Sequence, residues 1–327
     1  MQAISYFVFE NVKGLTVGKH RQLLDEVIEE FNELGYNVLL PYRVLNAANF
    51  GVPQDRRRLF LLGAKRGLRL PTYPQLETLP AGSEIDDLVL PLGPSVREAI
   101  GDLPDVEKFA QLLETDSVRM TLGNPSRYAA VLRGVVRDLG DFSYRRHLQS
   151  NVVTSSMRSD HTTESRKRFK ATVHGETEPI SRFHKLDPRG ICNTLRAGTA
   201  SDRGAFTSPR PIHPVYARCI TVREAARLHS YPDWFRFHVT KWHGFRQIGN
   251  SVPPLLARAV GKEIAIAMRY SPKVPGIKLQ LNNESLLSIN MAGASSYYSV
   301  PSNTIAKRIR LQGRIYVQDA GVATRYG

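Results

Sequence analysis

The sequence predicts an α/β fold in which residues 1–70 supply part of an open sheet and a larger, irregular, basic lobe follows. Two observations support this prediction. Apolar runs of strand type alternate with a helical segment in residues 1–70, and such alternation is typical of open α/β sheets. From about Pro71, prolines and glycines become frequent and the apolar periodicity weakens, which indicates a separate region.

Residues 6–9 form an apolar run of strand type, and residues 38–40 and 59–62 indicate two further short buried strands. Between the first two runs, Leu24, Ile28 and Phe31 fall at helical spacing, and Gly35 follows as a stop signal. So few strands do not complete a sheet of this kind. We therefore expect its remaining strands to come from outside residues 1–327.

The rest of the chain divides by composition into residues 71–215, 216–270 and 271–327. The second half of the first part is rich in arginine and lysine. Order returns at Thr221, which has the spacing of a capping box with Glu224, and a second helix is expected to begin at Pro253 or Pro254. Residues 271–327 are a Ser- and Asn-rich tail to which the sequence assigns no role.

Composition points to a polyanionic partner. The 327 residues include 45 lysines and arginines against 30 acidic residues, which gives a formal net charge of +15. Basic side chains displace counterions from nucleic-acid phosphates; the alternative is a ribosome-like or merely basic surface. No apolar stretch is long enough for a membrane span. The two cysteines lack metal-ligand spacing, so we expect no metal and a reducing, cytoplasmic compartment.

Three short motifs carry candidate chemistry, and each has a structural alternative. Glu10 ends the first strand, where ligands bind in open α/β sheets, but it also suits a loop cap. Arg56 and Arg58 alternate at a strand start, so they share one face and suit phosphate or base oxygens; they also suit a solvated basic run. Residues 247–254 indicate a tight turn with free amides before a helix, or an ordinary helix cap.

Taken together and in order, the motifs are more specific. Glu-Asn-Val at residues 10–12 precedes Gln-x-Arg-x-Arg at 54–58, then Arg-Glu-Ala-Ala-Arg-Leu at 223–228, then Gln-Ile-Gly-Asn-Ser-Val-Pro-Pro at 247–254. This order resembles the DNA cytosine-5 methyltransferase family and covers most of the chain. The resemblance implies a partial Rossmann-like S-adenosylmethionine-dependent methyltransferase sheet. It also implies a smaller, irregular, mostly β target-recognition domain at residues 71–215.

The resemblance also implies a reaction. Family members flip a cytosine out of duplex DNA, attack C6 with the cysteine of a Pro-Cys motif, and methylate C5 from S-adenosyl-L-methionine. Glu10 would bond the N3 edge of the base, Arg58 would reach its O2, and Arg56 would help to hold the site and a nearby phosphate. Because the strand that carries Arg58 runs antiparallel in this family, Arg58 and Glu10 would converge on one base.

The remaining expected contacts divide between cofactor and DNA. The cofactor-binding turn would comprise Asn250, Ser251 and Val252, and residues 223–233 would brace the recognition lobe. The expected contacts to duplex DNA are Arg145, Arg146, Arg166, Lys167, Arg168 and Arg196.

The chain departs from the family pattern in two motifs. Residues 1–327 contain neither the Gly-rich Phe-x-Gly-x-Gly loop nor the Pro-Cys nucleophile, because Cys192 follows Ile191 and Cys219 follows Arg218. We therefore expect this to be a carboxy-terminal part or subunit that needs an amino-terminal methyltransferase half. The alternatives are a DNA-binding or regulatory subunit without catalysis, and an inactive truncated product.

Overall fold

The computed structural model describes residues 4–84, 90–146, 151–198, 210–280 and 283–301, with 304, 308–311 and 314–317. The chain divides into two compact units, Met1–Leu281 and Asn282–Gly327. The first unit contains the sheet, residues 71–215 and the return to the sheet.

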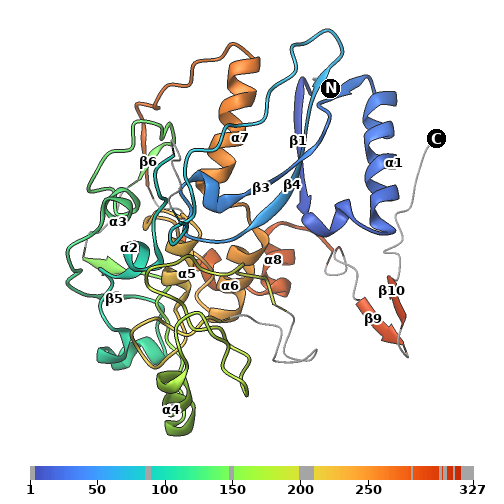
Figure 1. The fold of residues 1–327 in the computed structure, drawn as a ribbon. Coiled ribbons are helices and arrows are strands. Elements are labelled where there is room, and N and C mark those ends of the chain that lie inside the picture. The colour runs from blue at the N-terminus through green and yellow to red at the C-terminus, as the bar shows by residue number, and fades with distance from the viewer. Residues whose placement is uncertain are drawn as a thin grey trace. The chain divides into compact units, whose positions relative to one another are not determined.

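A four-stranded sheet organises the amino-terminal part of the first unit (Figure 1). Its strands are β1 (Tyr6–Val12), β2 (Tyr36–Val38), β3 (Arg43–Asn46) and β4 (Arg57–Lys65). β4 is central, because it pairs antiparallel with β1 along one edge and with β2 and β3 along the other.

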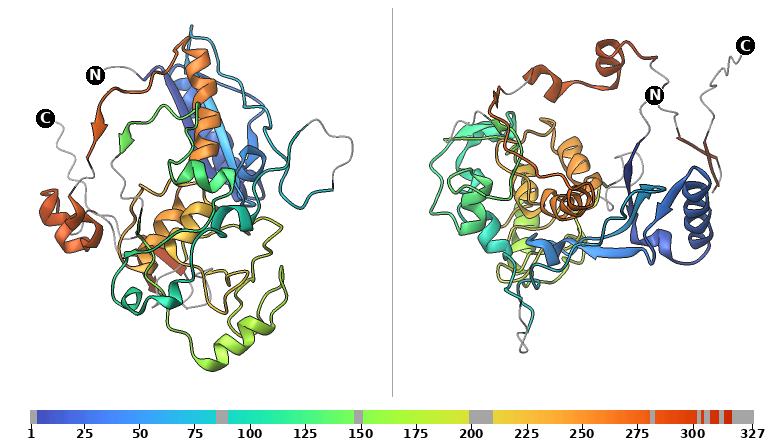
Figure 2. Two further views of the ribbon diagram at one scale, coloured as in Figure 1. Left: turned by 90° about the vertical axis from the view of Figure 1, so that its left-hand side faces the viewer. Right: turned by 90° about the horizontal axis from the view of Figure 1, so that it is seen from above.

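Helices cover both faces of this sheet. Successive side chains of a strand point to opposite faces, and accordingly Leu61 packs in the cluster with α1 (His20–Glu33), whereas Phe60 packs in the cluster with α7 (Pro254–Ala267). Figure 2 shows α1 and α7 on opposite sides of β1 and β4. The last helix of the predicted catalytic part therefore returns to the sheet from which the chain started.

Most predicted elements of this layer are confirmed. The helix is α1, and the runs at residues 6–9 and 59–62 lie within β1 and β4. The strand predicted at residues 38–40 lies two residues earlier than expected, since β2 ends at Val38 and Pro41, which has no amide hydrogen, follows shortly after. β3 was not predicted, because its four residues are too few to show an apolar period.

The described part of residues 71–215 is irregular, as expected, but its regular elements are mainly helices rather than strands. The helices are α2 (Val96–Ile100), α3 (Arg127–Leu132) and α4 (Thr163–Ala171). The strands are two residues each: β5 (Val118–Arg119) pairs with β7 (Val152–Val153), and β6 (Arg145–Arg146) pairs with β8 (Lys278–Leu279). The expected mostly β character is therefore wrong for these residues, because buried loops and short helices fill this core.

The return segment contributes α5 (Val222–Leu228), α6 (Lys241–Asn250) and α7. The predicted capping box is confirmed, since Thr221 caps α5 and Glu224 bonds back to the Thr221 amide. Helices α5 and α6 pack in one hydrophobic core with α2 and with Leu186 and Leu195. The segment therefore joins the core of residues 71–215 to the sheet.

The smaller elements complete the fold. The 3₁₀ helices are Lys13–Thr16, Ala47–Phe50, Val106–Lys108, Ala110–Leu113 and Glu284–Ser288. The second unit has α8 (Met291–Tyr297) and an antiparallel pair of β9 (Arg308–Leu311) and β10 (Arg314–Val317). Among the described residues, no helix is long and apolar enough to cross a membrane, and no three His, Cys, Asp or Glu side chains are grouped so as to hold a metal ion.

Candidate active site

Glu10 and Arg58 meet across the β1–β4 pair. In the register of this pair Glu10 lies opposite Phe60, and Val12 lies opposite Arg58, so the two polar residues are diagonal neighbours on one face. The Nε atom of Arg58 lies 3.1 Å from Oε1 of Glu10, and both side chains are partly exposed. The antiparallel pairing thus brings together two residues that lie far apart in the sequence, one near the end of β1 and one near the start of β4.

The surroundings shift the titration of both groups. Burial raises the pKa of Glu10, although the positive charges of Arg58 and Arg56 act in the opposite direction. Burial likewise lowers the pKa of Arg58, against the effect of Glu10. A carboxyl group with a raised pKa holds a proton more readily than a surface glutamate, and it can donate that proton to a bound partner.

Arg56, whose charge also acts on Glu10, does not point into solvent. Its side chain is fully buried, and its guanidinium donates to the carbonyls of Leu195 at 2.8 Å, Gly249 at 2.8 Å and Ser251 at 2.8 Å. The expected contact of Arg56 with a phosphate is therefore not available in this structure. The sequence pattern placed Arg56 on the same face as Arg58. It could not show that three backbone carbonyls from distant segments accept the hydrogen bonds of its guanidinium.

The segment around Arg56 is paired with residues 192–195. The Asp55 amide donates to the Cys192 carbonyl, and the Cys192 amide donates to the Pro53 carbonyl. The hydroxyl of Thr194 donates to the Asp55 carbonyl. This pairing, which sequence patterns did not indicate, fixes the chain immediately before Arg196 against the start of β4.

The predicted cofactor turn differs in form from the expectation. Gly249 and Asn250 form the last turn of α6, and the Ser251 amide donates to the Ile248 carbonyl. Free amides are scarce here, because Pro253 and Pro254 have none and the Leu255 amide donates to the Ser230 hydroxyl. The end of α6 therefore takes the place of the open turn whose free backbone amides the sequence predicted as ligand donors.

The side chains of this turn nevertheless suit one end of a small polar cofactor. Asn250 is exposed, and within the described part of the chain no hydrogen bond engages its amide. Val252 is half-buried and packs against the cluster that includes Phe60 and Leu256. An exposed amide beside an apolar wall fits the methionine end of S-adenosylmethionine, whereas residues 1–327 contain no Gly-rich loop for the remainder.

The predicted DNA contacts separate into exposed and engaged side chains. Lys167 on α4 and Arg196 are exposed. Arg166 forms ion pairs with Glu107 and Asp160, and Arg168 lies 3.3 Å from Glu178. Arg146 stacks over the rings of Trp234 and Tyr144. For Arg145 only the backbone, in β6, is described.

Neither cysteine has the environment of a nucleophile. Cys192 is fully buried and its thiol donates to the Asn193 carbonyl at 3.0 Å. Burial raises the pKa of Cys192, and it raises the pKa of Cys219 to about 12. A thiol of this kind stays protonated and unreactive at neutral pH.

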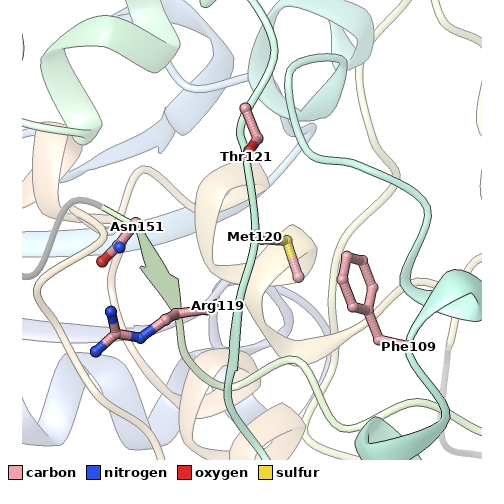
Figure 3. A pocket seen from close by; sticks show the side chains of 5 residues that line it. All are labelled: Phe109, Arg119, Met120, Thr121 and Asn151. Carbon is pink, nitrogen blue, oxygen red and sulfur yellow. The ribbon is translucent and has the colours of Figure 1, made fainter.

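A separate open hollow of about 480 Å³ lies within residues 109–151 (Figure 3). Met120 and Phe109 line one side, and Arg119 and Asn151 line the other. The hollow sits on the β5–β7 pair, where the Met120 amide donates to the Asn151 carbonyl. None of the predicted site residues lines it, so it is distinct from the Glu10–Arg58 pair.

Comparison with known proteins places these features in one family. Residues 4–265 match the C-5 cytosine-specific DNA methylase family. The chain is 60% identical over 305 residues to the Type II methyltransferase M.XorII of Xanthomonas oryzae pv. oryzae, covering 93% of this chain and 69% of the relative. It is 28% identical to the Type II methyltransferase M.AgeI of Thalassovita gelatinovora, over 80% of this chain and 73% of that protein.

A solved structure agrees with the sequence matches. A crystal structure described as a DNA modification methyltransferase encoded within an E. coli prophage aligns with a TM-score of 0.59 and 28% identity. The alignment covers 81% of this chain and 70% of that one. Members of the matched family use S-adenosylmethionine as methyl donor. The chain therefore belongs to the C-5 cytosine-specific DNA methylase family.

Proposed function

We propose that this chain captures the target cytosine and contacts the duplex in a DNA cytosine-5 methyltransferase. In this proposal an amino-terminal methyltransferase half supplies the Gly-rich loop and the Pro-Cys nucleophile. The observation that carries the proposal is the contact of Glu10 with Arg58 on one face of β1 and β4. Carboxyl and guanidinium side chains together match the N3 and O2 edge of a cytosine, which offers adjacent acceptors.

The chemistry assigned to this chain is proton placement. Attack on C6 of the flipped base pushes electron density toward N3 and O2. A protonated Glu10 would donate to N3, and Arg58 would turn from Glu10 to donate to O2, so that charge does not build up on the ring. The cofactor supplies the methyl group that C5 accepts. The raised pKa of Glu10 supports this role, because it favours the protonated carboxyl.

The need for a further half rests on the missing motifs and on β1. Residues 1–327 contain neither the Pro-Cys nor the Gly-rich motif. Within the described residues β1 pairs only with β4, and its Val8 and Val12 are 45% and 54% exposed. An unpaired edge with exposed apolar side chains suits the addition of another strand.

Duplex DNA is the proposed partner. The net charge of +15 and the exposed Lys167 and Arg196 support phosphate contacts. The Type II relatives support a place in a restriction–modification pair. An alternative, a recognition subunit without catalysis, is favoured by the burial of both cysteines.

Reconstitution tests the proposal. Labelled S-adenosylmethionine is incubated with duplex DNA and this chain, alone or with an amino-terminal half that carries both missing motifs. We expect no transfer by the chain alone and transfer by the pair. Incorporation by the chain alone would refute the need for a second half, and an inactive but DNA-bound pair would favour the non-catalytic alternative.

A further inference from the structure

His229 is a fully buried histidine that follows α5 and that no sequence motif singled out. Its Nδ1 lies 3.0 Å from the Nε2 amide nitrogen of Gln54. Its Nε2 lies 3.2 Å from both the carbonyl and the hydroxyl oxygen of Ser251. The ring therefore connects Gln54, which precedes β4, to the predicted cofactor turn.

The hydrogen-bond network fixes the tautomer of this ring. The Gln54 side chain accepts from the Leu195 amide through Oε1 and donates to the Leu228 carbonyl through Nε2, so its amide orientation is set. Because the Gln54 Nε2 atom only donates, Nδ1 of His229 must accept. The ring proton then sits on Nε2 and is donated to Ser251.

Charge around the ring keeps it neutral. Burial holds the pKa of His229 well below its usual value, and the positive charges of Arg56 and Arg58 act in the same direction, against the hydrogen bond to Ser251. The ring of Tyr231 stacks on the imidazole with centroids 5.8 Å apart. A second ring proton would also face the donor nitrogen of Gln54, so the Nε2–H form is the one that this site accommodates.

We propose that His229 is a positioning residue that holds the Ser251 carbonyl, and with it the Asn250 turn, in register with the start of β4. The Ser251 carbonyl accepts from the Arg56 guanidinium at 2.8 Å as well as from His229. Loss of the imidazole donor leaves the Ser251 carbonyl with the Arg56 donor alone. The proposal rests on the proposed function, because it assigns the turn to cofactor binding.

A matched pair of substitutions isolates the Nε2 donor. In His229→Gln the side-chain amide reaches the position of Nε2 and still donates to Ser251. In His229→Asn the amide ends near Nδ1 and the Ser251 carbonyl loses this donor. Both variants replace the ring by a neutral amide, so loss of ring stacking on Tyr231 is common to the two.

In the reconstituted enzyme we expect His229→Asn to raise the KM for S-adenosylmethionine about tenfold, as loss of one good hydrogen bond allows. We expect kcat to change less than about twofold, because the turn that His229 positions would bind the cofactor alike in the ground state and the transition state. For His229→Gln we expect a KM within about threefold of wild type, since its donor remains. Equal KM values for wild type and His229→Asn would overturn the proposal, as would equal losses in both variants.

Two measurements on the chain alone need no enzyme activity. Amide hydrogen exchange across residues 248–256 should be faster in His229→Asn than in His229→Gln, since only the former frees the turn. Histidine ¹⁵N NMR of the wild type should report a neutral ring protonated at Nε2 across pH 5–8. A ring protonated at Nδ1, a cationic ring, or equal exchange in the two variants would contradict the positioning role. These results do not depend on methyl transfer, so they are distinct from an inactive wild-type pair, which would refute the proposed function itself.

Discussion

The Nε atom of Arg58 and Oε1 of Glu10 lie 3.1 Å apart across two antiparallel strands. Arg58 lies two residues before Phe60 on β4, and Glu10 lies opposite Phe60 on β1. Both therefore share the sheet face that carries the buried Phe60 and Leu62. The same face of the sheet is thus apolar where α7 covers it and ionic where the sheet ends. The predictions for Glu10 and Arg58 rest on their position at this ionic end of the face.

Glu10→Gln should cripple methyl transfer by the reconstituted pair. Glutamine keeps the shape and donates a hydrogen bond, but it cannot exchange a proton with N3. We expect single-turnover rates to fall by roughly 100- to 10,000-fold, the range of general acid–base contributions, with DNA affinity little changed. A rate within about twofold of wild type would remove Glu10 from the reaction, because it lies far below that range.

Arg58→Ala should weaken both capture of the flipped base and the rate. It removes the donor for O2, which serves both capture of the base and stabilisation of the charge that develops on the ring. Arg58→Lys is the matched variant, since it keeps the charge but loses the planar fork. We expect an intermediate rate for lysine, measured with fluorescence of a base analogue at the target position to report flipping. Equal flipping by all three proteins would argue against contact of Arg58 with the base.

DNA binding should fall steeply with salt, and the exposed basic residues should account for part of the slope. Each phosphate contact contributes about 0.9 to the slope of log K against log salt. Lys167→Ala and Arg196→Ala should each reduce this slope by about 1, measured by fluorescence anisotropy over a salt series. Lys262→Ala, an exposed substitution on α7, controls for net charge. The same reduction in all three variants would show that these positions are not specific contacts.

Gly249→Ala should destabilise the first unit. A Cβ atom at this position would lie 2.3 Å from the Ala197 nitrogen and 2.4 Å from the Arg196 carbonyl carbon, and backbone cannot move aside cheaply. We expect a loss of about 1–3 kcal/mol in the free energy of unfolding, as for overpacked sites. Gly261→Ala in α7 is the control, because nothing lies within 4 Å of its Cβ. Urea unfolding that gives Gly249→Ala the stability of the control would contradict the close approach.

The Arg218–Glu224 ion pair should make stability depend on acid pH. Both side chains are buried, with Nη2 and Oε1 2.8 Å apart. Arg218 and His213 help to lower the pKa of Glu224 from 4.5 to about 2, against the effect of burial. The pair therefore stabilises the fold above pH 4.5, and this contribution is lost as the pH falls toward 2.

Glu224→Gln tests this dependence. It keeps an acceptor for the Thr221 amide but leaves Asp105 as the remaining carboxylate beside the buried Arg218 charge, so we expect a loss of about 3 kcal/mol at pH 7, the lower end of the range for a broken buried pair. Its free energy of unfolding should also change less than that of wild type between pH 4.5 and 2. Parallel pH profiles for the two proteins would mean that Glu224 does not carry the acid dependence.

Local sequence patterns determined the helix α1, the strands β1 and β4 and the cap of α5, because each depends on residues within a few positions of one another. The order of four short motifs determined the family, which residues 4–265 match. The domain limits and the roles of individual residues stay predictions. β3 was not predicted, because its four residues show no apolar period of their own and form a strand by pairing with β4.

Only the tertiary structure decided which basic side chains are free. Arg56 bonds to Leu195, 139 residues away, and Arg227 bonds to Asp102, 125 residues away. Both are fully buried, although the sequence gives them the same identity as the exposed Arg196. A guanidinium is buried only where distant carbonyls and carboxylates converge on it. The sequence could therefore count the positive charges of this protein, while the fold determined which of them remain available to DNA.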